Sequence, residues 1–194
     1  MKIALLLLTL AFTGTAKAGK YEHGTYKIDT AHSKVGFEVT HLVISSVEGR
    51  FNKVEGTLEM GKTLKDTSFD AIINVDSIDT GIKDRDDHLK SPDFFDAKKY
   101  QKILFKSKKV SAKGNRLTVL GDLTIKDTTK EVTLKGQFLG QVKDSYGNNK
   151  VAFEADGEIN RKDFGLTWTK MVEAGPVVGD KVKLNLKIQA SKAK

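Results

Sequence analysis

The feature that most constrains this chain is an alternation of apolar and polar residues that repeats along most of its length. It is clearest over residues 69–75, 117–125 and 182–188, where every second residue is apolar or glycine. Successive side chains of a β-strand point to opposite faces, so this pattern predicts strands with one buried face. Helical spacing is scarce. The chain is therefore predicted to be all-β.

The alternating stretches amount to about eight or nine strands, joined mostly by short polar turns such as residues 145–149, a strong hairpin turn. The alternation is found in ten stretches, some of them only three to five residues long: 26–28, 35–41, 47–51, 56–60, 69–75, 103–107, 117–125, 132–140, 151–159 and 182–188. Short turns favour antiparallel neighbours, and strands with one apolar face close into a barrel or stack as a sandwich. No linker or shift in composition divides the chain, so we predict one domain.

Residues 80–100 lack the alternation and predict a short helical connection. Thr80 or Asp79 is expected to cap a helix that runs through His88. Ser91-Pro92 is a good start for a further helix, since proline is favoured at the first helical position. Three aromatic residues would pack this connection onto the strands: Phe94, Phe95 and Tyr100.

The first eighteen residues have the pattern of a secretory signal peptide. A basic Lys2 precedes an apolar run from Ile3 to Phe12, and Ala16-Lys17-Ala18 forms a small-x-small cleavage site. The apolar run is about ten residues long, whereas a membrane-spanning helix needs about 20. We expect cleavage near Ala18, a barrel domain over 19–194 and a periplasmic or secreted location. A retained N-terminal anchor is the alternative.

The composition excludes several classes of protein. The chain has no cysteine, which excludes a disulfide framework, a cysteine metal site and a lipoprotein anchor. Its formal charge is +8, and without residues 1–18 it is +6, from 31 basic and 25 acidic residues. These charges are scattered and not interleaved with aromatic residues, so we expect no nucleic-acid partner. No later segment is apolar enough to cross a membrane.

Several glycines share the inward face with apolar residues. They are Gly49, Gly56, Gly121, Gly136, Gly140 and Gly157. Glycine on a barrel strand permits sharp bending, which is one interpretation. The other is that the missing side chains leave interior volume, since a small eight-stranded barrel either fills itself or holds one small ligand. Such a cavity would have apolar walls and take an apolar ligand.

Several spaced motifs over the whole chain after residue 18 resemble the YceI-like family of lipocalin-like, polyisoprenoid-binding proteins. The motifs are Tyr26-Lys-Ile-Asp-Thr-Ala-His32-Ser33, Gly49-Arg-Phe51, Arg85-Asp-Asp-His88-Leu89, Asp93-Phe94-Phe95-Asp96, Ile103-Leu-Phe105-Lys-Ser107, Gly121-Asp-Leu123-Thr-Ile125, Asn160-Arg161-Lys-Asp163-Phe164-Gly165 and Val178-Gly179-Asp180. The resemblance implies an extended antiparallel eight-stranded barrel with a short helical connection and a long isoprenoid or similar amphipathic lipid inside. It also implies, in many members, a homodimer. One departure is Gln101 after Tyr100, where the family often has proline.

We expect a set of aromatic, aliphatic and polar residues to line the barrel or its rim. They are Phe37, Val39, His41, Phe51, Ile73, Arg85, His88, Phe94, Phe105, Leu123, Phe153, Arg161 and Trp168. His41 is either a satisfied interior histidine or a hydrogen-bond partner of a ligand head group. Arg161 either pairs with Asp163 to hold a turn or offers its donors to a polar head at the mouth.

Two clusters raise other chemistries. Asp84, Asp86, Asp87 and His88 are close enough in sequence for a metal site, but a solvated, charge-balanced helix explains them better. His32-Ser33 has the residue types of a hydrolase, but adjacent strand residues point apart and are poorly placed to share a proton. We therefore expect no enzyme, no catalytic residue, no metal and no cofactor apart from a bound lipid.

The sequence predicts an exported, non-catalytic carrier of a long-chain isoprenoid, an isoprenoid quinone or a similar lipid. Two alternatives from other classes stay open. One is an enzyme that acts on a lipid or its head group, and the other is an exported interaction protein, related to stress, whose barrel exterior binds a partner.

Overall fold

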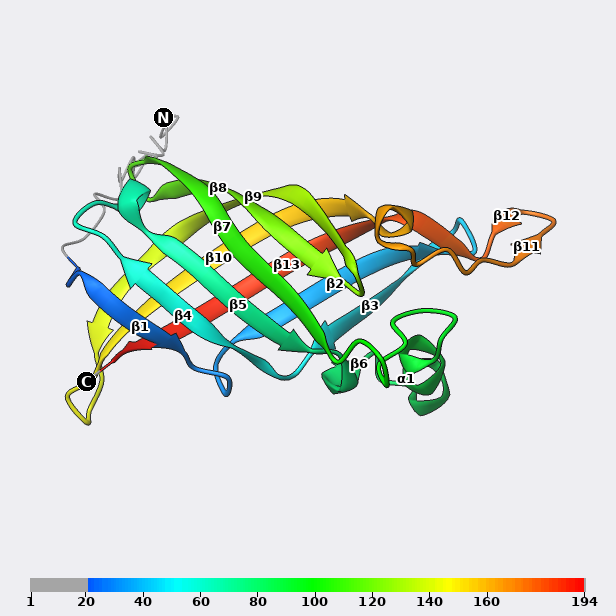
Figure 1. Ribbon diagram of the computed structural model, residues 1–194, viewed down its shortest axis with the longest axis horizontal. Coiled ribbons are helices and arrows are strands. Elements are labelled where there is room, and N and C mark those ends of the chain that lie inside the picture. The colour runs from blue at the N-terminus through cyan, green and yellow to red at the C-terminus, as the bar shows by residue number, and fades with distance from the viewer. Residues whose placement is uncertain (1–20, 194) are drawn as a thin grey trace, which may run out of the picture.

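The computed structural model describes residues 21–193, which form an elongated antiparallel β-barrel (Figure 1). Eight strands close the ring in the order β1-β4-β5-β7-β8-β9-β10-β13, and β13 pairs with β1 to complete it. These strands are β1 (Gly24–Ile28), β4 (Val54–Met60), β5 (Ser68–Asn74), β7 (Lys102–Lys113), β8 (Arg116–Ile125), β9 (Thr128–Lys143), β10 (Asn149–Asn160) and β13 (Val178–Lys192). The predicted all-β fold and eight-stranded barrel are confirmed.

The long strand β13 pairs with two different strands along the same edge. Its last residues pair with β1, from Ile28↔Ala190 to Tyr26↔Lys192, whereas its earlier part pairs with β2. β2 (Lys34–His41) continues to β3 (Ser45–Phe51), which pairs with the two-residue strand β6 (Ile78–Asp79). The sheet therefore extends beyond the closed ring at one end of the molecule.

The end of the barrel that holds both described chain ends is filled by side chains. Tyr26, Met60, Phe138 and Val151 are buried there in one apolar cluster. The Phe138 ring contacts the Phe153 ring at a centroid distance of 5.1 Å. We call this the closed end, because side chains from different strands pack against each other inside the barrel there.

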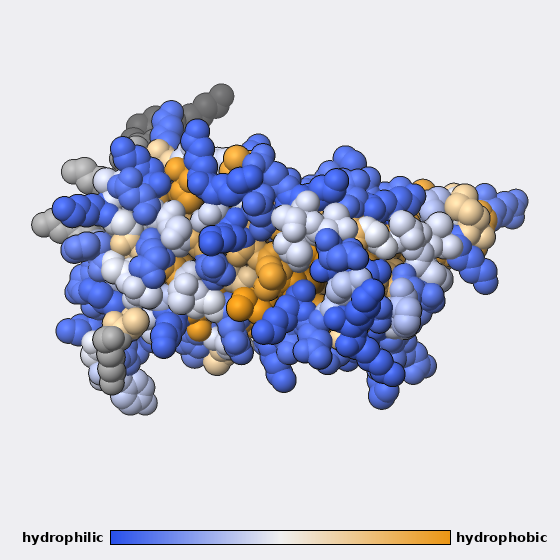
Figure 2. Space-filling model, viewed as in Figure 1, coloured by the Kyte–Doolittle hydropathy of each residue, from blue (hydrophilic) through white to orange (hydrophobic). Residues whose placement is uncertain are grey.

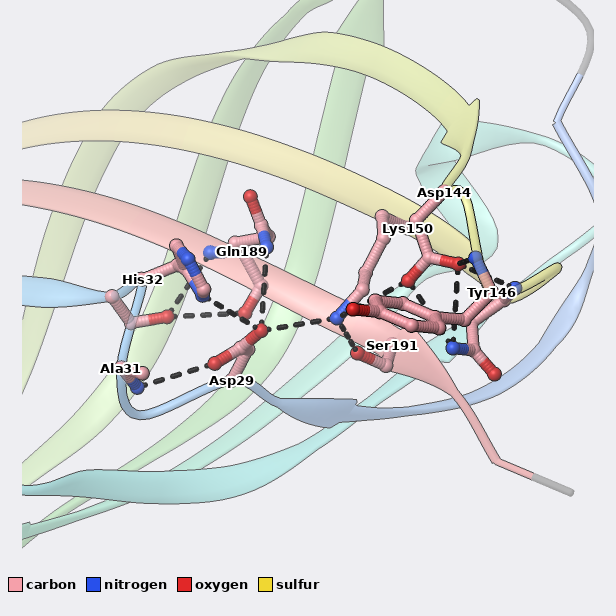
Figure 3. Close-up of polar contacts among 10 residues, drawn as sticks. Asp29, Ala31, His32, Asp144, Tyr146, Lys150, Gln189 and Ser191 are labelled. Atoms are coloured by element: carbon pink, nitrogen blue, oxygen red, sulfur yellow. Dashed lines mark hydrogen bonds and ion pairs between the residues drawn. The ribbon is translucent and has the colours of Figure 1, made fainter.

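A polar latch holds strands together at the closed end (Figure 3). The Lys150 Nζ of β10 lies 3.1 Å from the Asp29 carboxylate and donates to Ser191 Oγ of β13 at 2.7 Å. His32 Nδ1 lies 3.0 Å from the same carboxylate oxygen, Asp29 Oδ2, and Gln189 Nε2 also donates to it. The side chains of Asp29 and Lys150 are mostly buried, so the latch ties β1, β10 and β13 in low-dielectric surroundings.

At the other end the barrel wall is incomplete. β9 and β10 are paired only from Asn149↔Lys143 to Asp156↔Lys135. Residues 128–134 of β9 therefore pair with β8 alone, and residues 157–160 of β10 pair with β13 alone. We call this the mouth. Figure 1 shows that the helix α1 (Lys83–Lys90) and the small hairpin of β11 (Met171–Val172) and β12 (Gly175–Pro176) lie at the same end.

The connection between β6 and β7 contains one α-helix, α1 (Lys83–Lys90), and then turns. The expected cap is wrong: the residue before the helix is Ile82, and Thr80 donates instead to Asp86 Oδ1 from its N–H and its hydroxyl. The helix expected at Ser91-Pro92 does not form, because the N–H groups of residues 94–97 bond back to carbonyls of 89–91 in successive turns. Short 3₁₀ turns complete the chain: η1 (Leu64–Asp66), η2 (Val75–Ser77) and η3 (Arg161–Phe164).

Five of the six inward glycines have close neighbours where a side chain would lie, whereas Gly140 has nothing within 4 Å. A Cβ on Gly49 would lie 2.3 Å from Cζ of Phe37, its partner on β2, and a Cβ on Gly121 would lie 2.7 Å from the Phe105 ring. An aromatic ring thus covers Gly49 and Gly121, an arrangement that stabilises strands with missing side chains. Of the six glycines, Gly136 lines the cavity described below. The expectation that glycines create the interior volume is therefore largely wrong.

No helix within residues 21–193 is long and apolar enough to cross a membrane. The proposed signal peptide, residues 1–18, lies outside the described residues, so it stays a prediction.

Candidate functional site

An apolar cavity of about 220 Å³ runs along the barrel between the closed end and the mouth. Its lining residues on β13 extend from Val178 to Ile188, which corresponds to roughly 33 Å of strand at about 3.3 Å per residue. The buried closed-end residues Tyr26, Met60 and Phe138 are not part of the lining. The cavity is therefore long, and it stops before the closed end.

Most of the residues that the sequence predicted for the interior do line this cavity. They are Phe37, Val39, Phe51, Ile73, Phe94, Phe105, Leu123, Phe153 and Arg161. They come from strands on all sides of the barrel, apart from Phe94, which follows α1, and Arg161, which begins η3. Their contact with a ligand stays a prediction.

Three of the other predicted residues lie beside the mouth and do not line the cavity. His88 and Trp168 form an aromatic cluster with Phe94, and Arg85 holds the helix that carries His88. His88 lies between Phe94 and Trp168, with ring centroids 5.1 and 5.0 Å away, and its Nε2 is 2.9 Å from Asp93 Oδ2. Arg85 donates from Nε to Thr80 Oγ1 and from Nη2 to Thr80 O, so it fastens α1 to the preceding turn. Because Phe94 itself lines the cavity, the cluster connects the cavity wall to the surface.

His41 is the last residue of β2 and lies opposite Val178. It is half-buried and is not among the residues that line the cavity, although Val178 is. The predicted place of His41 in the lining is therefore not found: the alternation of β2 continues to His41, but the lining of β2 ends at Val39, two residues before it.

Arg161 is almost completely buried, with 3% of its surface exposed, and its guanidinium bonds to backbone. Nε donates to Gly179 O at 2.8 Å, and Nη1 donates to Trp168 O at 2.8 Å and also to Leu166 O. Its carboxylate partner is Asp180, at 3.3 Å, and not the expected Asp163. Burial lowers the pKa of Arg161, and the charge of Asp180 opposes that shift. The guanidinium therefore joins the 161–168 segment to β13.

The acidic residues of α1 bond to their own neighbours. Asp86 accepts from Thr80, Asp87 pairs with Lys83, and His88 lies beside Asp93. Within residues 21–193 no group of three or more His, Cys, Asp or Glu side chains is placed to hold a metal ion. The helix is thus a solvated, charge-balanced element.

His32 and Ser33 contact different partners. His32 lies against Asp29, whereas the Ser33 hydroxyl donates to Gln189 O at 3.0 Å. Both residues lie in the turn between β1 and β2, and not on a strand as the sequence argument assumed. Their side chains belong to the closed end, away from the cavity mouth.

Part of the cavity lining was not predicted from the sequence. The missed side chains include Ile28, Val35, Leu89, Phe95, Ile159, Leu166, Val178, Val182, Leu184, Leu186 and Ile188. The clean alternation of 182–188 was a signal that could have identified four of them. Leu89, Phe95 and Leu166 lie outside strands and gave no periodic signal.

The lining of the cavity consists almost entirely of aliphatic and aromatic side chains, which suits a hydrocarbon ligand. The polar exceptions are Thr57, Asp70, Glu154 and Arg161. Asp70 is exposed, the Glu154 carboxylate accepts from Gln137 Nε2, and the donors of Arg161 bond to carbonyls. Figure 2 shows an apolar area in the middle of the displayed face, surrounded by hydrophilic side chains. An apolar chain can thus be buried with little loss of polar hydration.

Comparison with known proteins identifies relatives of the same architecture. A family model described as the YceI-like domain matches residues 26–190. Protein YceI of Escherichia coli is 38% identical over 171 residues, which cover 86% of this chain and 88% of that protein. The structure of BcnA from Burkholderia cenocepacia has a TM-score of 0.73 at 26% identity and covers 84% of this chain and 98% of its own.

A more distant fold match is a polyisoprenoid-binding domain from Saccharophagus degradans, with a TM-score of 0.66 at 13% identity. It covers 89% of this chain and 100% of that domain, and at this identity it supports the fold alone. The family model, the identity to protein YceI and the closed eight-stranded barrel agree, and the chain belongs to the YceI-like family.

Proposed function

We propose that the protein is an exported, non-catalytic carrier of a long-chain isoprenoid, an isoprenoid quinone or a similar amphipathic lipid. The observation that carries this proposal is the long apolar cavity between the closed end and the mouth. A hydrocarbon chain fits its length and chemistry, whereas a compact polar ligand does not. The name of the Saccharophagus degradans domain adds support from a protein of the same fold.

The driving force would be burial of hydrocarbon. Each buried CH₂ contributes about 0.8 kcal/mol, so a chain of ten such groups gains about 8 kcal/mol before the cost of ordering the chain. The polar head would stay at the mouth, because the cavity wall offers few polar groups beyond those already hydrogen-bonded. Carriage outside the cytoplasm depends on the predicted signal peptide over 1–18. The homodimer stays a prediction, which analytical ultracentrifugation can test.

A matched pair of variants tests the carrier function. Val39 and Val182 face each other across β2 and β13 and both line the cavity. Val39→Phe/Val182→Phe should obstruct it and remove the bound lipid, measured by mass spectrometry of organic extracts of the purified protein. The control is Lys183→Phe, because Lys183 is the next residue along β13 and its side chain is exposed.

The wild-type protein and the Lys183→Phe control should yield the same lipid, and the double variant should yield at least tenfold less with an unchanged circular-dichroism spectrum. Repeated absence of lipid from the wild-type extract, or equal lipid in the double variant, would refute the carrier proposal. Conversion of an added lipid into a product would instead support the enzyme alternative.

A further inference from the structure

Exposed apolar side chains gather on two adjacent turns at the mouth. Ile44 is 87% exposed and Val43 is 54% exposed in the β2–β3 turn, and Met171 is 66% exposed in β11. Together with Leu42 and Val172 they form what we call the apolar tip. Figure 1 shows the β11–β12 hairpin projecting beyond the barrel, and Figure 2 shows apolar residues at that same extremity.

The two turns are fastened to each other, so the apolar tip is one defined surface. The N–H of Leu42 donates to Val177 O at 2.9 Å, and the N–H of Val177 donates to Lys170 O at 2.8 Å. Gly175 approaches so closely that a Cβ there would lie 3.1 Å from Cγ2 of Val43.

Local backbone preference does not explain the residues at the tip of the β2–β3 turn. Leu42 has a φ of 51° and Val43 a φ of 68°, a left-handed conformation that glycine or asparagine adopts at lower cost. A β-branched residue such as Val43 is a genuine outlier there. Apolar side chains are thus kept at two strained positions, of which Leu42 is half-buried and Val43 exposed, and this points to a function for their apolar character.

The apolar tip continues the wall of the cavity. Val39 on β2 and Val178 on β13 both line the cavity; along the chain Val39 is three residues before Leu42, and Val178 is six residues after Val172. A hydrocarbon chain that leaves the cavity at the mouth would therefore meet the tip next, without crossing a polar surface on these two strands other than His41 and Thr40.

From this arrangement we propose that the apolar tip inserts into the surface of a lipid bilayer and places the mouth there for lipid exchange. This inference rests on the carrier function proposed above. A few side chains on a narrow projection suit a bilayer, which needs no complementary shape. They are too few for a stable protein interface, which buries about 800 Å² on each partner.

The charges on the tip predict which bilayer it binds. Its immediate charged residues are Lys170 and Glu173, which balance each other. Binding should therefore depend on apolar insertion and tolerate salt, in contrast to attraction by a basic patch. Neutral phosphatidylcholine vesicles and vesicles of phosphatidylethanolamine with phosphatidylglycerol should bind the protein within about threefold of each other.

The test is flotation of the purified full chain with both kinds of vesicle at 50 and 500 mM salt. The variant Leu42→Asn/Val43→Gly/Ile44→Ser removes the apolar side chains and relieves the backbone strain, so it should fold at least as well as the wild type. We expect its vesicle binding to fall at least tenfold, because each exposed aliphatic side chain withdrawn from the bilayer loses about tenfold in partition.

The control variant Val142→Ser/Tyr146→Ser removes a comparable exposed apolar area from the opposite end of the barrel, where Val142 is 65% and Tyr146 89% exposed. It should bind vesicles as the wild type does. Equal binding by the tip variant, no binding by the wild type, or binding that needs phosphatidylglycerol and disappears at 500 mM salt would overturn the proposal. A tip variant that changes the mass in solution would also overturn it, since a second copy would then cover the tip.

A second measurement separates this proposal from the carrier function. Trp168 is the one tryptophan of the chain and lies beside the mouth, so quenching of its fluorescence by detergent-dispersed decyl-ubiquinone reports on the cavity. The tip variant should keep that quenching while it loses vesicle binding, which supports the tip. Loss of both together would assign the tip residues to the cavity and overturn the proposal. A wild type that floats without quenching would count against the carrier function alone.

Discussion

At the scale of single residues, Arg161 shows how one buried cation can organise a rim. The sequence left two roles open for it, a partner for Asp163 or a receptor for a ligand head group. The structure instead directs its donors to the carbonyls of Gly179, Leu166 and Trp168. A rigid fork of five donors suits this task, because carbonyls from two segments lie at fixed angles around it.

Arg161→Lys should therefore destabilise the fold even though it keeps the charge. Lysine is a point donor that cannot reach all these carbonyls, and the loss of charged hydrogen bonds costs about 2 kcal/mol. For a chain of this size that corresponds to a fall of about 4–8 °C in Tm. Thermal unfolding followed by circular dichroism measures it. If Arg161→Lys instead left the Tm unchanged and abolished lipid binding, Arg161 would be assigned to binding the ligand head group.

At the scale of elements, the latch of Figure 3 holds the ends of β1, β10 and β13 through Asp29. Burial alone would raise the pKa of this carboxyl. The hydrogen bonds from Lys150 and His32, together with their charges, outweigh burial and lower the pKa below its ordinary value. A carboxylate with a lowered pKa contributes stability above its unfolded pKa of about 3.9, and that contribution disappears as the pH falls through the folded value.

Asp29→Asn should thus cost about 1–2 kcal/mol at pH 7, since the group is mostly buried but not sealed from solvent. The difference between variant and wild type should shrink as the pH drops below about 4. Urea unfolding at pH 7 and pH 3 measures both values. Asp163→Asn, on the exposed side of η3, is the control and should change neither. A difference that is equal at both pH values would contradict the assignment of the latch to a carboxylate.

The elements themselves were largely predictable, because alternation is a local property of each strand. The long strands β8, β10 and β13 and the hairpin turn before β10 follow from it directly. The branching of β13 between β1 and β2, and the separation of β9 from β10, depend on pairings between distant segments and left no local signal. Trp168 was expected at the interior or rim, and its place beside His88 depends on the 161–168 segment that Arg161 holds.

At the scale of the whole molecule, the fold combines one filled end with one cavity that its own side chains leave empty. A protein with such a cavity should be more stable with its ligand than without. Delipidation by partial unfolding and organic extraction should therefore lower the Tm. A ligand present at 100 times its Kd stabilises by about 2.7 kcal/mol, which corresponds to roughly 5–10 °C here.

Differential scanning calorimetry before and after delipidation measures this shift, and addition of decyl-ubiquinone should restore part of it. Val39→Phe/Val182→Phe is the control, because its obstructed cavity should hold no lipid and make its Tm insensitive to extraction. A delipidated wild type with an unchanged Tm would show that the bound lipid is not held in the barrel.

The pairing of Tyr26 with Lys192 places the beginning and the end of the described chain at the same end of the barrel. Both ends of the described chain leave from the closed end, and the mouth with its apolar tip faces the opposite way (Figure 1). A handle attached beyond Lys192, the last residue of β13, such as an affinity peptide on a sensor chip or a fused fluorescent domain, would therefore hold the molecule by its base. Every copy immobilised in this way would present its mouth outward to the solution.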